Sequence, residues 1–295
     1  MILALLQALR PKQWTKNLLL FAGVLFSLHM NDLSLVARAF YGFLAFSLLA
    51  GSVYLLNDLL DIESDRQHPT KRNRPIASGR LPAWVARVML PVVAATAIAI
   101  AWPLGPGFCL VMGLYLVMNL AYSFWLKHQV LIDVFVIALG FVLRAIAGVQ
   151  LLIPVQPQTG ISPWLLVCTF FGALFLALAK RRRELENHGD GAGKRRAVLK
   201  SYSPELLDGM LLVTAATSLM AYALYTIWPA TVAKFGTEAM LYTVPFVAYG
   251  IFRYLFLVRS SSSSEDPSQV LLTDRPLAGC VALYLIAVLV ILYFA

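Results

Sequence analysis

Long apolar stretches, separated by short polar segments, run along the whole of this chain. Each stretch approaches the ~20 residues that an α-helix needs to cross the hydrocarbon core of a bilayer. The pattern predicts an all-α, polytopic membrane protein. No change of composition marks a domain boundary, so residues 1–295 are expected to form one transmembrane domain. The nine predicted spans lie near residues 17–36, 38–58, 83–103, 108–126, 131–152, 163–180, 206–228, 239–258 and 276–294.

The composition agrees with a membrane protein. Hydrophobic residues make up 60% of the chain and charged residues only 13%, whereas soluble domains are about 45–50% apolar and about 25% charged. The three cysteines are isolated in apolar stretches and have neither the spacing of a metal site nor that of a disulfide framework. The four histidines also lack metal-ligand spacing, and we assign them no catalytic role.

The net charge of +9 is concentrated in alternate loops. Lysine and arginine are abundant before the first span, after the second span and after the sixth span. The loops 103–107 and 153–162 have none, and 229–238 has only Lys234. Because positively charged loops remain in the cytoplasm, we expect the N-terminus to be cytoplasmic and the C-terminus to be outside. The run Lys194–Arg196 fits a solvated loop that sets this topology.

An acidic cluster followed by a basic one interrupts the apolar pattern at residues 57–75, NDLLDIESDRQHPTKRNRP. Asp58, Asp61 and Asp65 are spaced i, i+3, i+7 and would share one face of a helix. Carboxylate oxygens suit Mg²⁺, which commonly bridges to substrate phosphates. The cations that follow favour phosphate oxygens; they are Lys71, Arg72 and Arg74. The segment predicts a site for a diphosphate ester. A loop whose charges served only to set the membrane topology would require the basic residues, but it would not require three aspartates at helical spacing.

A second set of charges lies within residues 122–148. Lys127 belongs to a short cytoplasmic turn, Asp133 begins the fifth span, and Arg144 lies roughly 16 Å deeper at the rise of an α-helix. An arginine at this depth usually faces a polar cavity. Asp133 and Arg144 are 11 residues apart and therefore share a helix face, which favours one cavity that opens to the cytoplasm. The alternative is a structural pair between Arg144 and a buried carboxylate.

Two further basic segments border predicted spans. In the segment 10–17, RPKQWTKN, Lys16 and Asn17 could line the cavity, although a basic anchor on anionic lipid explains the segment equally well. In the segment 180–184, KRRRE, Lys180 and Arg181 directly abut the membrane, and we predict that they bind phosphate.

The pattern N-D-x-x-D-x-x-x-D resembles the UbiA-type intramembrane prenyltransferase superfamily, and the resemblance covers nearly the whole chain. It implies nine transmembrane helices around a central cavity, with Mg²⁺ held by aspartates. Members that use prenyl diphosphates usually carry a second acidic motif near the fourth and fifth spans, where this chain has only Asp133. Five other stretches instead look like the decaprenyl-phosphate phosphoribosyltransferase branch: RPKQWxKN, HPTKRxRPIASG, LKHQx(4)D, LRAIAG and AKRxxEL.

That branch implies transfer of 5-phosphoribose from phosphoribosyl diphosphate (PRPP) to a polyprenyl (decaprenyl) phosphate, with release of diphosphate, towards decaprenylphosphoryl arabinose and cell-envelope glycan. The resemblance implies catalytic and Mg²⁺-binding roles, with Mn²⁺ as a substitute ion, for Asp58, Asp61 and Asp65. The expected substrate-binding residues are Lys16, Asn17, Asn57, Lys71, Arg72, Arg74, Tyr122, Lys127, Asp133, Arg144, Lys180, Arg181 and Glu184. The expected partners are PRPP, the lipid phosphate and the bacterial inner membrane, without nucleic acid and with homo-oligomerisation left open.

Two other functions compete with this prediction. An aromatic or quinone-pathway prenyltransferase would use a prenyl diphosphate as its electrophile. The surplus of cations favours substrates that carry several phosphates between them over one diphosphate and a ring. A lipid-phosphate transporter is the more remote alternative, because transporters often show internal repeats with interrupted helices, and the sequence shows no such repeat.

Overall fold

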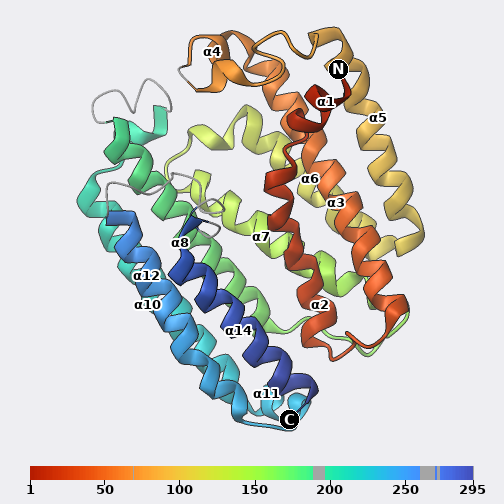
Figure 1. Ribbon diagram of the computed structural model, residues 1–295, viewed down its shortest axis with the longest axis vertical. Coiled ribbons are helices and arrows are strands. Elements are labelled where there is room, and N and C mark those ends of the chain that lie inside the picture. The colour runs from red at the N-terminus through yellow and green to blue at the C-terminus, as the bar shows by residue number, and fades with distance from the viewer. Residues whose placement is uncertain (69, 189–196, 260–269, 271–272, 295) are drawn as a thin grey trace. The chain divides into compact units, whose positions relative to one another are not determined.

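The computed structural model describes residues 1–68, 70–188, 197–259, 270 and 273–294 (Figure 1). Within these ranges the regular structure is helical, which confirms the predicted all-α fold. In chain order the helices are α1 (Ile2–Ala8), η1 (Pro11–Leu20), α2 (Phe21–Phe26), α3 (Leu33–Leu60), α4 (Ile62–Arg66), η2 (Lys71–Asn73), α5 (Ala83–Ala101), η3 (Trp102–Leu104), α6 (Pro106–Phe124), η4 (Leu126–His128), α7 (Ile132–Gln150), α8 (Pro163–His188), η6 (Ala197–Ser201), α10 (Pro204–Ile227), α11 (Pro229–Phe235), η7 (Ala239–Thr243), α12 (Val244–Arg259) and α14 (Arg275–Tyr293), where η marks a 3-10 helix.

Eight helical segments among the described residues are long and apolar enough to cross a membrane. They correspond to the second to ninth predicted spans, so the chain is a polytopic membrane protein by length and composition. The segments are Leu33–Leu60, Ala83–Leu104, Pro106–Phe124, Ile132–Gln150, Pro163–Glu186, Pro204–Ile227, Ala239–Arg259 and Arg275–Tyr293.

The predicted first span, residues 17–36, is not a single helix, and the predicted count of nine is therefore not confirmed. Helix α2 ends at Phe26, and Leu28 then adopts a left-handed conformation with φ of 65°. Asp32 caps the next helix by accepting hydrogen bonds from the backbone N–H groups of Ser34 and Leu35, so α3 begins before residue 38. The predicted span of residues 17–36 ran across this break because the polar residues in 27–32, SLHMND, form only a short interruption between two long apolar stretches.

Segment η1–α2 nevertheless has nearly the length of a membrane crossing. It consists of ten residues of 3-10 helix and six of α-helix. At a rise of about 2.0 Å and about 1.5 Å per residue, these extend over about 29 Å, close to the ~30 Å of a hydrocarbon core. The extended 3-10 conformation therefore lets this segment reach as far as a longer α-helix.

Backbone packing divides the chain into two compact units. Unit 1 comprises Met1–Trp125 and Leu143–Ile161, and unit 2 comprises Leu126–Val142 and Ser162–Ala295. In unit 1, α3 packs along α5 and also contacts η1, α2 and α6. In unit 2, α8 packs along α10, while α12 contacts α8, α10 and α14. Each unit has its own buried apolar cluster. The single-domain interpretation of the sequence stays a prediction.

A close crossing of two backbones organises unit 1. A Cβ atom placed on Gly148, in α7, would lie 2.3 Å from the carbonyl oxygen of Leu20. A Cβ atom on Gly23, in α2, would lie 2.5 Å from the carbonyl oxygen of Gly148. Small residues permit such approaches between membrane helices, where packing rather than hydrophobic burial drives association. The glycine of the LRAIAG stretch is therefore required for α7 to contact η1 and α2.

Arg38 ties together three helices of unit 1. Its Nε donates to the carbonyl oxygen of Leu151 at 3.0 Å, and its Nη2 donates to that of Leu104 at 2.5 Å. Both carbonyls lie at or just beyond helix ends, where intrahelical donors are missing. Arg38 was not predicted from the sequence, because its acceptors are backbone carbonyls 66 and 113 residues away.

Gly148→Ala tests the close crossing. We expect a loss of about 1–3 kcal/mol in the free energy of unfolding, because the methyl group collides with backbone rather than with a flexible side chain. Gly113→Ala, in α6, is the matched control, since a Cβ atom there meets nothing within 4 Å. Chemical unfolding of the two variants in detergent measures the difference. Equal stability of the two variants would contradict the proposed packing.

Candidate functional site

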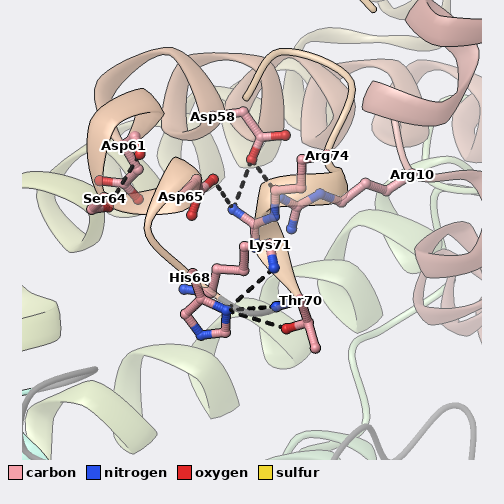
Figure 2. A network of polar contacts seen from close by, with 9 residues as sticks. All are labelled: Arg10, Asp58, Asp61, Ser64, Asp65, His68, Thr70, Lys71 and Arg74. Atoms are coloured by element: carbon pink, nitrogen blue, oxygen red, sulfur yellow. Dashed lines mark hydrogen bonds and ion pairs between the residues drawn. The ribbon is translucent and has the colours of Figure 1, made fainter. Parts of the chain in front are cut away.

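The acidic segment folds around a bend at Asp61. Helix α3 ends at Leu60 and α4 begins at Ile62, with Asp61 between them at φ of −99° and ψ of 12°. Backbone hydrogen bonds still run from Asp61 N to Asn57 O and from Asp65 N to Asp61 O, so the path stays helical but turns. The three aspartates therefore do not lie on one uninterrupted helix, which the predicted shared face assumed. Asp58 and Asp65 come together, whereas Asp61 lies apart from them beside Ser64 (Figure 2).

Two arginines bind the Asp58 and Asp65 carboxylates (Figure 2). Arg74 Nη1 donates to Asp58 Oδ1 at 3.1 Å and to Asp65 Oδ2 at 2.7 Å. Arg10 Nη2 donates to the same Asp58 oxygen. The side chains of both aspartates are 2% exposed, while those of Arg74 and Arg10 are 26% and 28% exposed. Buried carboxylates require such partners because the removal of unpaired charge from water is strongly unfavourable. We call these four residues the acid–arginine cluster.

Arg10 is directed to the acid–arginine cluster by a tight turn between α1 and η1. Its own backbone is left-handed, with φ of 52° and ψ of 62°, a conformation that L residues adopt infrequently. The guanidinium also lies over the ring of Tyr54, with its central carbon 4.6 Å from the ring centroid. Sequence reasoning did not select Arg10 as a site residue, because it is 48 residues from Asp58 and only Lys16 and Asn17 of its segment were predicted to line the cavity.

The cluster has donors that suit Mg²⁺ bound together with phosphate. Among the described residues, no group of three His, Cys, Asp or Glu side chains is arranged to hold a metal ion. However, Mg²⁺ usually retains several waters and is held by one or two carboxylates plus substrate phosphates. Asp58 and Asp65 supply two carboxylates that already share one cationic nitrogen. These residues therefore fit a divalent cation that is completed by a phosphate ligand.

The basic loop beside this cluster is shaped by His68. Its Nδ1 accepts hydrogen bonds from the backbone N–H groups of Thr70 and Lys71, each at 3.2 Å (Figure 2). Lys71 is partly exposed and Arg72 is exposed. Several other predicted ligands are also partly exposed: Lys16, Asn57, Tyr122, Lys127 and Lys180.

Arg144 and Asn17 are buried together in unit 1. Arg144 Nε donates to Asn17 Oδ1 at 2.7 Å, and Arg144 Nη2 donates to the Tyr115 hydroxyl at 2.8 Å. Asn17 Nδ2 in turn donates to Ser47 Oγ at 2.9 Å. Arg144 and Gly148 are one helical turn apart, so the same face of α7 supplies both the polar contact and the close crossing with η1 and α2. These contacts give Asn17 and Arg144 a structural role. That the two residues also line a substrate cavity stays a prediction.

In unit 2 the arginines of the KRRRE segment bind three different helices. Arg181 Nε donates to Asp133 Oδ2, in α7, at 2.8 Å. Arg182 Nε donates to Asp208, in α10, at 3.0 Å, and Arg183 Nη1 donates to the Val258 carbonyl, in α12, at 3.1 Å. The run is therefore an internal hub centred on α8 rather than a solvated charge run. Residues 194–196, predicted to form a solvated loop, lie outside the described residues.

Arg181 is the most deeply buried member of the hub. Its side chain is 1% exposed, and its Nη1 also donates to Glu184 Oε2 at 2.6 Å. Asp133 is fully buried. These contacts indicate a structural role for Arg181, Asp133 and Glu184, which differs from the substrate-binding role predicted from the sequence. Lys180, the first residue of the run, is partly exposed, and its binding of phosphate stays a prediction.

Tyr202 connects this hub to the turn before α7. Its hydroxyl donates to Asp133 Oδ1 at 2.9 Å and accepts a hydrogen bond from the backbone N–H of Leu131 at 2.8 Å. Leu131 is held in a left-handed conformation, with φ of 66°. Burial raises the pKa of Tyr202 to about 12, so the hydroxyl keeps its proton at neutral pH. No spacing in the sequence indicated Tyr202, which is 71 residues from Leu131.

Arg253 and Asp274 form another ion pair in unit 2. Arg253 Nε and Nη2 donate to the two carboxylate oxygens at 3.1 and 2.8 Å. Asp274 also caps α14 by accepting from the Leu277 N–H at 2.9 Å. The hydrogen bond from Arg253 lowers the pKa of Asp274. This bidentate pairing explains both charges structurally, so neither is added to the functional residues.

Tyr202→Phe tests the role of this hydroxyl. Its loss removes the hydrogen bond to the Leu131 N–H, and a typical intramolecular hydrogen bond contributes about 0.5–1.5 kcal/mol. We expect faster amide hydrogen exchange in the peptide that covers residues 126–133. Tyr242→Phe is the control, because that side chain is 76% exposed. Unchanged exchange in Tyr202→Phe would show that the hydroxyl does not hold the turn.

Comparison with known proteins identifies the family. Residues 18–274 match the UbiA prenyltransferase family. The decaprenyl-phosphate phosphoribosyltransferase of Mycobacterium tuberculosis is 35% identical over 283 residues, which cover 94% of this chain and 90% of the relative. The protein of the same name from Corynebacterium glutamicum is 34% identical over 298 residues, covering 98% of this chain and 86% of the relative.

A solved structure supports the same assignment at the level of fold. The UbiA homolog from Archaeoglobus fulgidus bound to GPP and Mg²⁺ aligns with a TM-score of 0.72 and 20% sequence identity, covering 98% of this chain and 99% of that chain. The family predicted from N-D-x-x-D-x-x-x-D is thus confirmed. The chain belongs to the UbiA prenyltransferase family.

Proposed function

We propose that this protein transfers 5-phosphoribose from PRPP to a polyprenyl phosphate and releases diphosphate. The acid–arginine cluster suits any diphosphate donor, so it does not by itself separate phosphoribosyl transfer from prenyl transfer. The observation that carries the choice is the 34–35% identity, over more than nine-tenths of the chain, to curated decaprenyl-phosphate phosphoribosyltransferases. The basic loops fit a bacterial cytoplasmic membrane with the N-terminus on the cytoplasmic side.

The diphosphate end of the donor is assigned to the acid–arginine cluster. Asp58 and Asp65 would hold Mg²⁺, which when bound neutralises the charge of the departing diphosphate. Lys71 and Arg72, from the adjoining loop, are proposed to bind the remaining diphosphate oxygens. Arginine and lysine both favour phosphate, and charge-assisted hydrogen bonds to it are the stronger ones. Asp61, which lies apart from the pair, is assigned a supporting role through water.

The reaction exchanges one C–O bond for another at the anomeric carbon. The bond from that carbon to the diphosphate breaks, and its electron pair leaves with the diphosphate. A bond forms to an oxygen of the lipid phosphate. That phosphate has a second pKa of about 6 and is mostly dianionic at neutral pH. No strong general base is therefore needed, and the protein acts chiefly by positioning the groups and neutralising charge around an oxocarbenium-like transition state.

The other phosphate groups of the reaction require further cations. We assign this role to the partly exposed side chains of Lys180 and Lys127. Arg181 is proposed to act through Lys180, because its contacts with Asp133 and Glu184 fix the part of α8 that carries Lys180. Neither lysine determines the length of the polyprenyl chain or the later use of the product.

Asp58→Asn and Asp65→Asn should each lower turnover by at least about 100-fold, since each removes a proposed metal ligand. Asp61→Asn should retain more activity, because Asp61 lies outside the carboxylate pair. Turnover is measured with labelled PRPP and Mg²⁺. Glu63→Gln is the control for general loss of negative charge, because Glu63 is exposed and pairs with Arg66. An equal loss in Asp61→Asn and Asp58→Asn would contradict the two-carboxylate assignment.

Product analysis separates phosphoribosyl transfer from its alternative. Purified protein with labelled PRPP, Mg²⁺ and a polyprenyl phosphate should form a lipid-soluble phosphosugar and release diphosphate, and EDTA should stop the reaction. Geranyl diphosphate with 4-hydroxybenzoate should yield no prenylated ring. A prenylated ring, without release of diphosphate from PRPP, would replace the proposed function by aromatic prenyl transfer.

A further inference from the structure

We propose that Arg74 is a built-in counter-ion of the metal site, which holds Asp58 and Asp65 until a diphosphate arrives and then transfers its hydrogen bonds to the diphosphate. Metal and PRPP would consequently bind together rather than in separate steps. This inference rests on the proposed function, because it assumes that the cluster receives a metal and a diphosphate.

The position of Arg74 Nη1 is the first support. This nitrogen lies within hydrogen-bonding distance of one oxygen of each carboxylate, at 3.1 Å from Asp58 and 2.7 Å from Asp65. It therefore occupies the place from which a cation would bridge the two carboxylates. A metal ion bound between these two oxygens would lie where Arg74 Nη1 now lies, so the ion and the guanidinium compete for one position.

The charge balance of the cluster is the second support. Two carboxylates face two guanidiniums, so the four side chains are together neutral. A divalent cation added alone would place two further positive charges beside Arg10 and Arg74, where burial weakens screening by solvent. A diphosphate that enters with the cation restores the balance and offers Arg74 new acceptor oxygens. Metal and diphosphate should therefore increase each other's affinity, and this coupling is reciprocal.

The way the cluster is built makes Arg74 the movable member. Asp58 and Asp65 are fixed on α3 and α4, and both are almost fully buried. Arg10 is restrained by its contact with the Tyr54 ring. The two arginine side chains are similarly exposed, but Arg74 follows the short helix η2 and has an extended backbone with φ of −61° and ψ of 146°. A change of its side-chain rotamer is sufficient to leave the carboxylates.

Binding of Mn²⁺ without PRPP tests the proposal, with electron paramagnetic resonance as the measure of free ion. Arg74→Gln should bind Mn²⁺ at least about tenfold more tightly than the wild type, because a positive charge that competes for the same oxygens is gone. Arg66→Gln is the matched control: it removes the same charge nearby, but Arg66 pairs with Glu63 outside the cluster. Its affinity for Mn²⁺ should change by less than about threefold.

The second arm measures binding of labelled PRPP by flow dialysis. Wild-type protein should bind PRPP much more tightly with Mn²⁺ than without it, whereas Arg74→Gln should show weaker binding and a smaller effect of Mn²⁺. If Arg74→Gln does not fold, Arg74→Met, which also removes the charge but keeps a long unbranched side chain, should show the same trends.

The outcomes distinguish the inference from the proposed function. Equal or weaker Mn²⁺ binding by the Arg74 variant, with PRPP binding intact in the wild type, would overturn the counter-ion role and leave the proposed function standing. Absence of both Mn²⁺ and PRPP binding in the folded wild type would overturn the proposed function, and the inference with it.

Discussion

The pairing of buried carboxylates with arginines is the interaction on which the rest of this structure depends. A chain that is 60% hydrophobic offers charged groups few favourable environments. Asp58 and Asp65 can remain buried only because Arg74 and Arg10 bind them. The pairing also joins the N-terminal turn, the end of α3 and the basic loop in unit 1. The proposed site for a diphosphate is therefore also a structural junction.

The same constraint organises unit 2 with different residues. Arg181 and Asp133 are both buried and bind each other, and Tyr202 extends their contact to the turn before α7. Arg182 and Arg183 bind α10 and α12. A run that looks like a solvated loop in the sequence thus becomes a set of long-range contacts, because three adjacent positions on a helix point in different directions. Arg181 and Arg183 are buried, whereas Lys180 is partly exposed and is the member of the run that we propose to bind a substrate phosphate.

Much of the fold and the centre of the candidate site could be predicted from local patterns. The apolar stretches predicted the eight helices that are long enough to cross a membrane, and the pattern N-D-x-x-D-x-x-x-D predicted the family. The break between α2 and α3 was missed because it depends on a left-handed Leu28 and on the cap at Asp32 rather than on hydrophobicity. The separation of Asp61 from Asp58 and Asp65 was missed because helical spacing assumes a straight axis. The partners of Arg10, Arg38 and Tyr202 are tens of residues away, where sequence spacing carries no information.

The central claim is that Asp58 and Asp65 form a site for a metal ion and a diphosphate, with Arg74 moving between the carboxylates and the phosphate. Anomalous scattering from Mn²⁺, in crystals grown with PRPP, measures this most directly. Our account places the anomalous peak between the Asp58 and Asp65 carboxylates, with the Arg74 guanidinium on the diphosphate. A peak elsewhere, or a bound diphosphate while Arg74 still bridges both carboxylates, would contradict it.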